Sequence, residues 1–285
     1  MTNLDNRLYI VATPIGNLQD FSYRAVEVLR SVDWIAAEDT RRARLLLQHY
    51  GIQNKLVSVH DHNEAFKAPE LIKKLVSGMS GALISDAGTP LISDPGLPLV
   101  RLAKEAGVKV SPIPGACALV AALSVSGVAV SGFSFEGFLG RTSASRRAFF
   151  TEKLADTRTW VFYESSHRIL ACLKDLAATL PDNRKIAVAR EMTKIYETVL
   201  YAPVSEVLRE VEDNENMRKG EFVVIVEGCA LKKVSEVSAE QLRVLTILLK
   251  TQTVKGAVAL AVEITEGSKK LLYREALRIV KEQRE

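Results

Sequence analysis

Short apolar runs alternate with longer amphipathic segments through the first part of the chain. The runs are bounded by Gly, Pro or polar residues, as buried parallel strands are, and they lie at residues 8–12, 33–37, 55–59, 82–85 and 108–112. Between them apolar residues recur at helical spacing, for example at Leu99, Leu102, Ala103 and Ala106. Strands that alternate with helices predict a parallel sheet covered by helices.

A second α/β pattern starts near Phe133, and an all-helical pattern follows it. Strand-like runs lie at 159–163, 185–189 and 221–226, and a helical stripe contains Ile169, Leu173, Leu176 and Leu180. Residues 228–237 read as a linker, and the helices after it break near Gln252 and Gly267. We therefore expect an α/β chain with two α/β domains at 1–120 and 121–230 and a small helical domain at 231–285.

Composition limits the class of protein. Of 285 residues 47% are hydrophobic, enough for a sizeable core in more than one domain. The net charge of +4 arises at the C-terminus, where residues 232–285 hold 11 Lys and Arg against 7 Asp and Glu. Three scattered cysteines form no disulfide framework or zinc spacing, which favours a cytoplasmic protein. No signal peptide is visible, and the most apolar window, 116–130, is too short to span a bilayer.

The loop SDAGTPLISDPG at 85–96 is the strongest candidate for a binding site. It follows an apolar strand, and ligands of open α/β sheets bind at the carboxyl ends of strands. Asp86, Gly88, Thr89, Pro90 and Asp94 stand at this position. The alternative is an ordered turn in which Asp94 caps a helix that starts at Leu97.

Other strand ends carry weaker signals. Pro14 and Gly16 lie in a turn after the first strand, but neither a Rossmann glycine fingerprint nor a Walker loop is present. His60 and His62 could suggest a metal, yet no third ligand has a recognisable spacing, so solvated or substrate-contacting side chains are favoured. Two further strands are followed by polar clusters, which lie at residues 162–168 and 189–197. For the first cluster, helix capping with a local ion pair is the alternative interpretation.

Taken together, the loops resemble those of the tetrapyrrole methylase superfamily of S-adenosylmethionine-dependent enzymes, in a branch that methylates small-subunit ribosomal RNA. The matching stretches, in order between residues 8 and 229, are VATPIGNL (11–18), AEDTR (37–41), SDAGTPLISDPG (85–96), PIPG (112–115), FYESSHR (162–168), AREMTK (189–194) and KGEF (219–222).

The resemblance implies the two-domain class III methyltransferase fold with S-adenosyl-L-methionine in the cleft between the domains, and a homodimer. It implies methylation of the ribose 2′-hydroxyl of a cytidine in the decoding region of 16S rRNA. Asp86 is expected to accept hydrogen bonds from the cofactor, and a helix that starts at Gly115 to offer N–H groups to its carboxylate. The expected cofactor residues are Pro14, Gly16, Asp86, Gly88, Thr89, Pro90, Gly115, Ala116, Tyr163 and Ala189.

A ribose hydroxyl is a poor nucleophile near neutral pH, so the reaction requires a base or a cation that favours the alkoxide. The candidates for this role are Asp39, Glu64, Glu191 and Lys194. The sequence does not show which of these four residues is the base. We nevertheless expect Glu191 and Lys194 to be essential for turnover. Lys194 would act through a lowered pKa or through its charge.

Cations that could contact RNA phosphates lie in three places. Arg41 and Arg190 flank the expected site, and Arg141, Arg146 and Arg147 form a basic segment. On a helical wheel Lys270, Arg274, Arg278 and Lys281 fall within about 80°, opposite Leu272, Ala276, Ile279 and Val280. This basic face could follow phosphates, or it could be a solvated amphipathic face. The end of the chain also resembles the helix-turn-helix-like tail of the family.

Two other functions remain open. A methylase of a cobalamin or other tetrapyrrole precursor would also need basic contacts, but it would not need a helical arm. A non-enzymatic nucleic-acid-binding regulator would use the C-terminal helices, but it would not explain the polar loops. Binding of S-adenosylmethionine would separate the regulator from the enzymes.

Overall fold

The first sheet contains five strands, all parallel. They are β1 (Arg7–Val11), β2 (Trp34–Ala37), β3 (Leu56–Ser58), β4 (Gly81–Ile84) and β5 (Lys109–Ile113), and they pair in the order β3-β2-β4-β1-β5. The predicted parallel sheet is confirmed.

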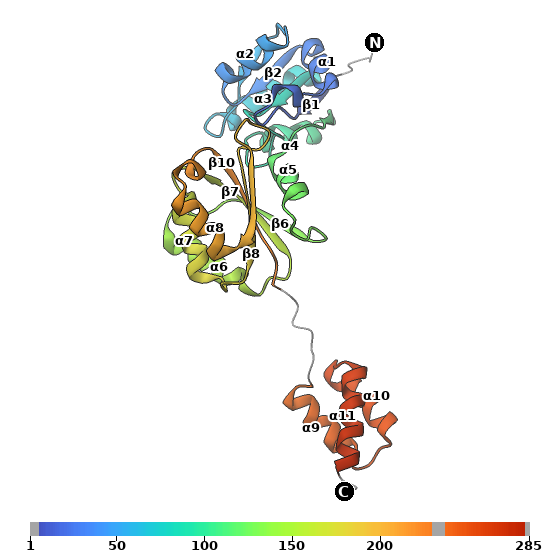
Figure 1. Cartoon of the computed structure of the whole chain (residues 1–285). Helices are drawn as coiled ribbons and strands as arrows, with labels where there is room; N and C mark the ends of the chain where they lie inside the picture. Colours follow the sequence, from blue (N-terminus) through green and yellow to red (C-terminus); the bar gives the residue numbers. More distant parts are fainter. Residues whose placement is uncertain (1–5, 230–236, 283–285) are drawn as a thin grey trace. The chain divides into compact units, whose positions relative to one another are not determined.

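The computed structural model describes residues 6–229 and 237–282, which belong to two compact units, Met1–Cys229 and Ala230–Glu285 (Figure 1).

Helices cover both faces of this sheet. The helices are α1 (Tyr23–Ser31), α2 (Thr40–His49), α3 (Glu64–Val76) and α4 (Leu97–Glu105). Alternate side chains of β2 enter different cores, because successive residues of a strand point to opposite faces. Ile35 and Ala37 pack with α1 and α2, whereas Trp34 and Ala36 pack with α3 and α4. Burial on both faces explains why these strands read as continuous apolar runs.

The helix after β5 starts later than the sequence predicts. Pro114 and Gly115 remain in the loop, and α5 (Ala118–Val125) begins after Cys117, whose backbone is extended. The expectation of free helical N–H groups at Gly115 is therefore wrong. The amide of Leu119, in the first turn of α5, donates to the Tyr163 hydroxyl at 3.2 Å.

The second sheet is mixed. Its strands are β6 (Phe133–Phe138), β7 (Thr159–Ser165), β8 (Lys185–Arg190), β9 (Thr198–Pro203) and β10 (Glu221–Val226), in the order β6-β7-β10-β8-β9. Strands β6 and β7 pair in parallel, and the other neighbours are antiparallel. The sequence reading did not separate out β9, an edge strand whose residues are partly buried or exposed. Edge strands lack the continuous apolar pattern of buried ones.

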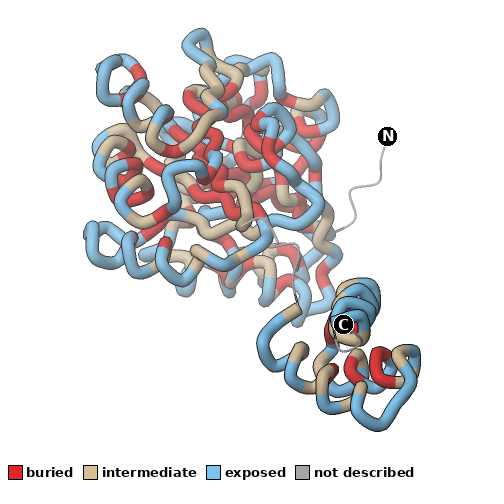
Figure 2. The backbone as a smooth tube through the Cα atoms, turned by 60° about the horizontal axis from the view of Figure 1, so that its bottom comes forward, coloured by how far each residue is buried: buried red, intermediate tan, exposed pale blue. Residues whose placement is uncertain are grey.

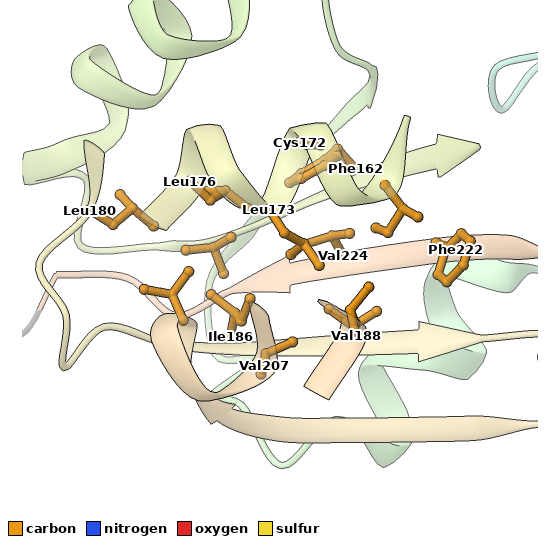
Figure 3. Close-up of a cluster of buried hydrophobic side chains, with 14 of the residues drawn as sticks. Phe162, Cys172, Leu173, Leu176, Leu180, Ile186, Val188, Val207, Phe222 and Val224 are labelled. Carbon is orange, nitrogen blue, oxygen red and sulfur yellow. The ribbon is translucent and has the colours of Figure 1, made fainter. Parts of the chain in front are cut away.

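Helices α6 (Ser143–Glu152), α7 (Ile169–Thr179) and α8 (Val204–Asp213) accompany this sheet. The predicted stripe is confirmed, since Ile169, Leu173, Leu176 and Leu180 are buried in the main core of the sheet. Figure 3 shows Leu173, Leu176 and Leu180 among these core side chains. The opposite face packs against Leu119, Ala122 and Leu123 of α5. Short 3₁₀ helices of the unit Met1–Cys229, which contains both sheets, lie at Leu18–Asp20, Lys153–Ala155 and Glu215–Arg218.

The C-terminal unit is helical, as predicted. It contains α9 (Ala239–Leu248), α10 (Val254–Thr265) and α11 (Lys269–Glu282), around a core that includes Leu245, Val258 and Leu272. Figure 2 shows buried positions in the interior of each unit. Most of the predicted linker at 228–237 lies outside the described residues. Within residues 6–229 and 237–282, no helix has the length and apolar character needed to cross a membrane.

Candidate active site

A cavity of about 400 Å³ lies in the first unit, bounded by loops of the first sheet and by strands of the second. The loops after β2 and β4 contribute Glu38 and residues 86–89 and 92–94. The second sheet contributes Tyr163, Phe222 and Val223. Carboxyl ends of parallel strands thus form one wall of the cavity, which is the usual place for a ligand in an α/β protein.

A second space of about 370 Å³ adjoins the first. Residues that line both spaces are Ile15, Arg42, Asp86, Ala87, Lys194 and Glu221. Pro14 and Gly16 line the second space, beside Leu18, Leu45 and Leu46. Together the two spaces are within the range of about 300–1,000 Å³ that small-molecule sites occupy.

Backbone hydrogen bonds fix the loop after β4 against the turn after β1. The amide of Thr13 donates to the Gly88 carbonyl at 2.8 Å, and the Gly88 amide donates back at 3.1 Å. The Thr89 hydroxyl donates to the Ala116 carbonyl at 3.2 Å, so three loops form one connected wall. Gly88 has a φ of +85°, a conformation that L side chains rarely adopt, which explains glycine at this point.

Asp86 is the best-placed of the predicted cofactor residues. Its carboxylate accepts from the Asp39 amide at 3.0 Å and from Arg42 at 3.1 Å, and it lines both spaces. Gly88, Thr89 and Tyr163 line the first space.

The remaining predicted cofactor residues lie outside the walls of the two spaces. Pro90 is buried, and Ala189 is a fully buried core position of β8, so neither side chain lines either space. After β5, the wall is formed by Cys117 and by Ala118, the first residue of α5, in place of Gly115 and Ala116.

Two of the predicted base candidates make other contacts. Asp39 caps α2 and forms an ion pair with Arg41 at 2.7 Å, and these hydrogen bonds hold the pKa of Asp39 well below its usual range. Glu64 accepts from the Gly96 amide at 2.8 Å, at the start of α4. Glu64 thus accepts a hydrogen bond at the N-terminus of α4, where the sequence pattern suggested Asp94 as the cap.

The other two candidates pair with each other. The Lys194 ammonium lies 2.8 Å from Glu191 and 2.9 Å from Glu221, and Glu191 also accepts from the Glu221 amide at 3.0 Å. Burial raises the pKa of Glu191, but the hydrogen bond from Lys194 and that from the Glu221 amide outweigh it and lower the pKa. Burial lowers the pKa of Lys194, but its two carboxylate partners outweigh this effect and raise it. Lys194 is therefore a fixed positive charge and not a neutral base.

The predicted phosphate contacts separate into surface and interior groups. Arg41, Arg141 and Arg147 are exposed. Arg146 is buried and lies 2.6 Å from Asp175, and buried Arg190 donates to the carbonyls of Lys219 and Tyr196. The phosphate contacts expected for Arg146 and Arg190 are corrected accordingly, because both guanidinium groups are occupied inside the fold.

The basic face of the last helix is present on α11. Lys270, Arg274 and Arg278 are exposed there, whereas Leu272 and Ala276 are buried. Arg278 forms ion pairs with Glu275 at 2.8 Å and with Glu282 at 2.9 Å, which reduces the net positive charge of this face.

Several cavity residues were missed from the sequence, among them Glu38, Arg42, Phe138 and Met192. Glu38 directly follows β2, so its place at a strand end was a usable signal. Phe138 is apolar and carried none, whereas Met192 lies within the AREMTK stretch but was not expected to line a site. The rings of His60 and His62 lie 6.0 Å apart, and within the described parts of the chain no group of three or more His, Cys, Asp or Glu side chains is arranged to hold a metal ion.

Comparison with known proteins identifies two family models. The model of Tetrapyrrole (Corrin/Porphyrin) Methylases matches residues 7–208, and that of the RsmI C-terminal HTH domain matches residues 235–279. In the solved crystal structure of the methyltransferase CobJ, 97% of that chain aligns with 80% of this one at a TM-score of 0.58 and 16% identity, which shows a shared fold.

Curated relatives extend over nearly the whole chain. Ribosomal RNA small subunit methyltransferase I of Escherichia coli O157:H7 is 50% identical over 275 residues, or 96% of each chain. The protein of the same name from Pasteurella multocida (strain Pm70) is 47% identical over 97% of this chain and 99% of its own. The chain is a methyltransferase, and it belongs to the ribosomal RNA small subunit methyltransferase I family within the tetrapyrrole methylases.

Proposed function

We propose that the protein transfers a methyl group from S-adenosyl-L-methionine to the ribose 2′-hydroxyl of a cytidine in 16S rRNA of the small ribosomal subunit. The single observation that carries this proposal is the identity of about half of all residues with relatives named for small-subunit ribosomal RNA, over both units of the chain. We also propose domain limits of 1–120, 121–230 and 231–285, with the cofactor between the first two.

The residues around the two spaces fit this cofactor. The Asp86 carboxylate offers acceptors for an ammonium or for ribose hydroxyls, and Arg42 and Lys194 supply cations for a carboxylate. Ile15, Met192 and Val223 provide apolar surface for an adenine ring. When bound, S-adenosylmethionine supplies an activated methyl group on a sulfonium centre.

Catalysis by this chain then depends mainly on alignment and charge. The connected loops after β1, β4 and β5 form a fixed wall against which a substrate hydroxyl can be oriented. The Lys194 ammonium favours negative charge on an attacking oxygen, and Glu191 holds Lys194 in place. In this proposal Glu191 is a positioning residue, because its carboxylate is already bonded to Lys194 and to the Glu221 amide.

RNA contacts are proposed for cations at the surface. Arg41 is exposed in the first turn of α2, and Arg141 and Arg147 lie around the start of α6. In the C-terminal unit, Lys270, Arg274 and Arg278 are the proposed phosphate contacts. Cations of this kind position a protein on RNA without reading its sequence.

A homodimer and a cytoplasmic location complete the proposal. Helix α5 is apolar around most of its circumference: Leu119 and Leu123 face the second sheet, whereas Val120 and Val125 are 59% and 53% exposed. A second copy that covers the exposed side would bury this surface. Sedimentation velocity tests it, since Val120→Glu should lower the mass of a dimer to that of a monomer.

Methylation of a tetrapyrrole precursor is the alternative. The solved methyltransferases of that class align with 78–80% of this chain, so about a fifth of the chain has no counterpart in them. The match of residues 235–279 to an HTH domain favours a nucleic acid substrate for the whole chain.

The test uses small subunits isolated from a strain that lacks the enzyme. With radiolabelled S-adenosylmethionine, label should appear on the ribose of one cytidine after nucleoside mapping. Label on a base, or no label on RNA together with methylation of a tetrapyrrole, would overturn the proposal.

A further inference from the structure

Asp94 and Glu38 differ from the other acidic side chains around the cavity, because neither forms an ion pair within the described structure. Asp86 pairs with Arg42, Glu164 with Arg168, and Glu221 with Lys194. Asp94 lines the cavity from the same loop as Asp86, but among the described residues it forms no ion pair within 4.0 Å. An acid without a cation retains its affinity for a proton.

The segment around Asp94 does not have a capping role that would explain the residue. Helix α4 begins after Gly96, its N-cap residue, which has no side chain to form a capping hydrogen bond. The Gly96 amide donates to Glu64. Leu91 and Ser93 have φ angles of +71° and +67°, which non-glycine residues rarely adopt. Backbone held in such conformations is concentrated at functional sites.

Ser85 is the polar neighbour that acts on the Asp94 carboxyl. The Ser85 hydroxyl donates to the Gly88 carbonyl at 3.0 Å, and it also acts on the Asp94 carboxyl, whose pKa it lowers. Ser85 has a single hydroxyl proton, so it cannot donate to both acceptors at once. Its proton is committed to Gly88, so Ser85 offsets only part of the effect of burial on the Asp94 carboxyl.

We propose that Asp94 is the general base that takes the proton from the ribose 2′-hydroxyl, an inference that rests on the proposed function. An electron pair of the 2′-oxygen forms the new bond to the methyl carbon, and the pair of the carbon–sulfur bond remains on sulfur. The 2′-hydroxyl proton moves to Asp94, which later returns it to solvent. The sulfonium loses its positive charge and Asp94 its negative charge, so the step is balanced.

The electrostatic surroundings agree with this role. Burial, followed by the nearby acids, raises the pKa of Asp94 to about 6, and the opposing effect of Ser85 is included in this value. A base with a pKa near the working pH is the most effective kind. Glu38 is the competing acid, because burial and nearby acids also raise its pKa, an effect that Arg42 and His60 oppose only in part. The charged and titratable groups that line the cavity with Asp94 or act on its pKa are Glu38, Arg42, Asp61, Asp86, Cys117, Tyr163, Glu164, Lys194 and Glu221.

The test compares Asp94→Asn, Glu38→Gln and a matched control, Asp61→Asn, which removes an exposed acid nearby. Single-turnover methyl transfer to subunits that lack the modification is measured over a pH range of about 5 to 9, which brackets the working pH of such a base. Wild type and Asp61→Asn should lose rate below about pH 6, in a limb of unit slope. Asp94→Asn should be at least ~100-fold slower and should lack this limb.

Calorimetric affinity for S-adenosylmethionine and the thermal midpoint of unfolding should remain at wild-type values in Asp94→Asn, and Asp94→Glu should recover part of the rate. Near-normal turnover of Asp94→Asn, loss of its cofactor affinity, or disappearance of the limb in Glu38→Gln alone would overturn the inference. Failure of wild type to label ribosomal RNA would instead overturn the proposed function.

Discussion

The methylene chain of Lys194 lies directly over Gly16. A Cβ atom built on Gly16 would come within 2.4 Å of the Lys194 Cγ and 2.9 Å of its Cε. The turn after β1 and the loop after β8 therefore meet at a point where only glycine leaves room. This contact sets the position of the Lys194 ammonium between Glu191 and Glu221.

Gly16→Ala should displace Lys194 and slow methyl transfer about tenfold, because a ~1 Å misplacement near reacting groups can cost up to ~100-fold. Single-turnover rates measure this effect. Gly132→Ala is the matched control, since a Cβ there meets only Arg158 at 3.8 Å. Equal rates for the two variants would show that the position of Lys194 is unimportant.

Lys194→Met should reduce the single-turnover rate on the order of 100-fold, because it removes a charge near the developing alkoxide and keeps most of the side-chain volume. Since the Lys194 pKa is raised above its ordinary value of 10.5, Lys194 stays protonated throughout the neutral range, about pH 6 to 9. The rate profiles of wild type and variant should have the same shape at different heights. A change of shape in this range would contradict a fixed-charge role.

Asp175→Asn should lower the free energy of unfolding by about 3 kcal/mol at pH 7, because it leaves buried Arg146 without its partner. Burial raises the pKa of Asp175, but hydrogen bonds from Ser143, Arg147 and Arg146 outweigh it and lower the pKa below 3.8. The stabilisation is thus complete above pH 3.8 and is lost as the pH falls through the lower, folded-state value.

Urea unfolding at a series of pH values, from about 7 down to about 3, measures this difference, which should stay constant to about pH 4 and then shrink. Asp182→Asn, which changes an exposed acid, is the control and should match wild type at every pH. A difference between wild type and Asp175→Asn that grows on acidification would contradict the assignment.

The double variant Lys270→Gln and Lys281→Gln should weaken binding to small subunits. The salt slope of the affinity should fall by about one for each phosphate that the variant no longer neutralises. Cofactor affinity should not change. Lys104→Gln, which removes an exposed charge of α4, is the control. An unchanged salt slope would indicate that the basic face of α11 is solvated and does not bind RNA.

Local pattern was sufficient for the elements of the core. The runs at 8–12 and 82–85 appear as β1 and β4, and the stripe from Ile169 to Leu180 is buried along α7. Burial on one or both faces leaves a periodic signal in the sequence, so these elements are readable from it. The sequence was less informative at Thr198–Pro203, where an edge strand is only partly buried.

The α/β class, the helical C-terminal unit and the polar loops at strand ends follow from the sequence alone, because these depend on periodicity and on breakers close together in the chain. Tertiary structure decided which polar groups of those loops are available. It placed Arg146 and Arg190 inside, gave the start of α4 to Glu64, and left Asp94 facing the cavity. Such roles depend on partners far away in the sequence, as between Glu64 and Gly96 or Asp39 and Asp86, and no local pattern encodes these distances.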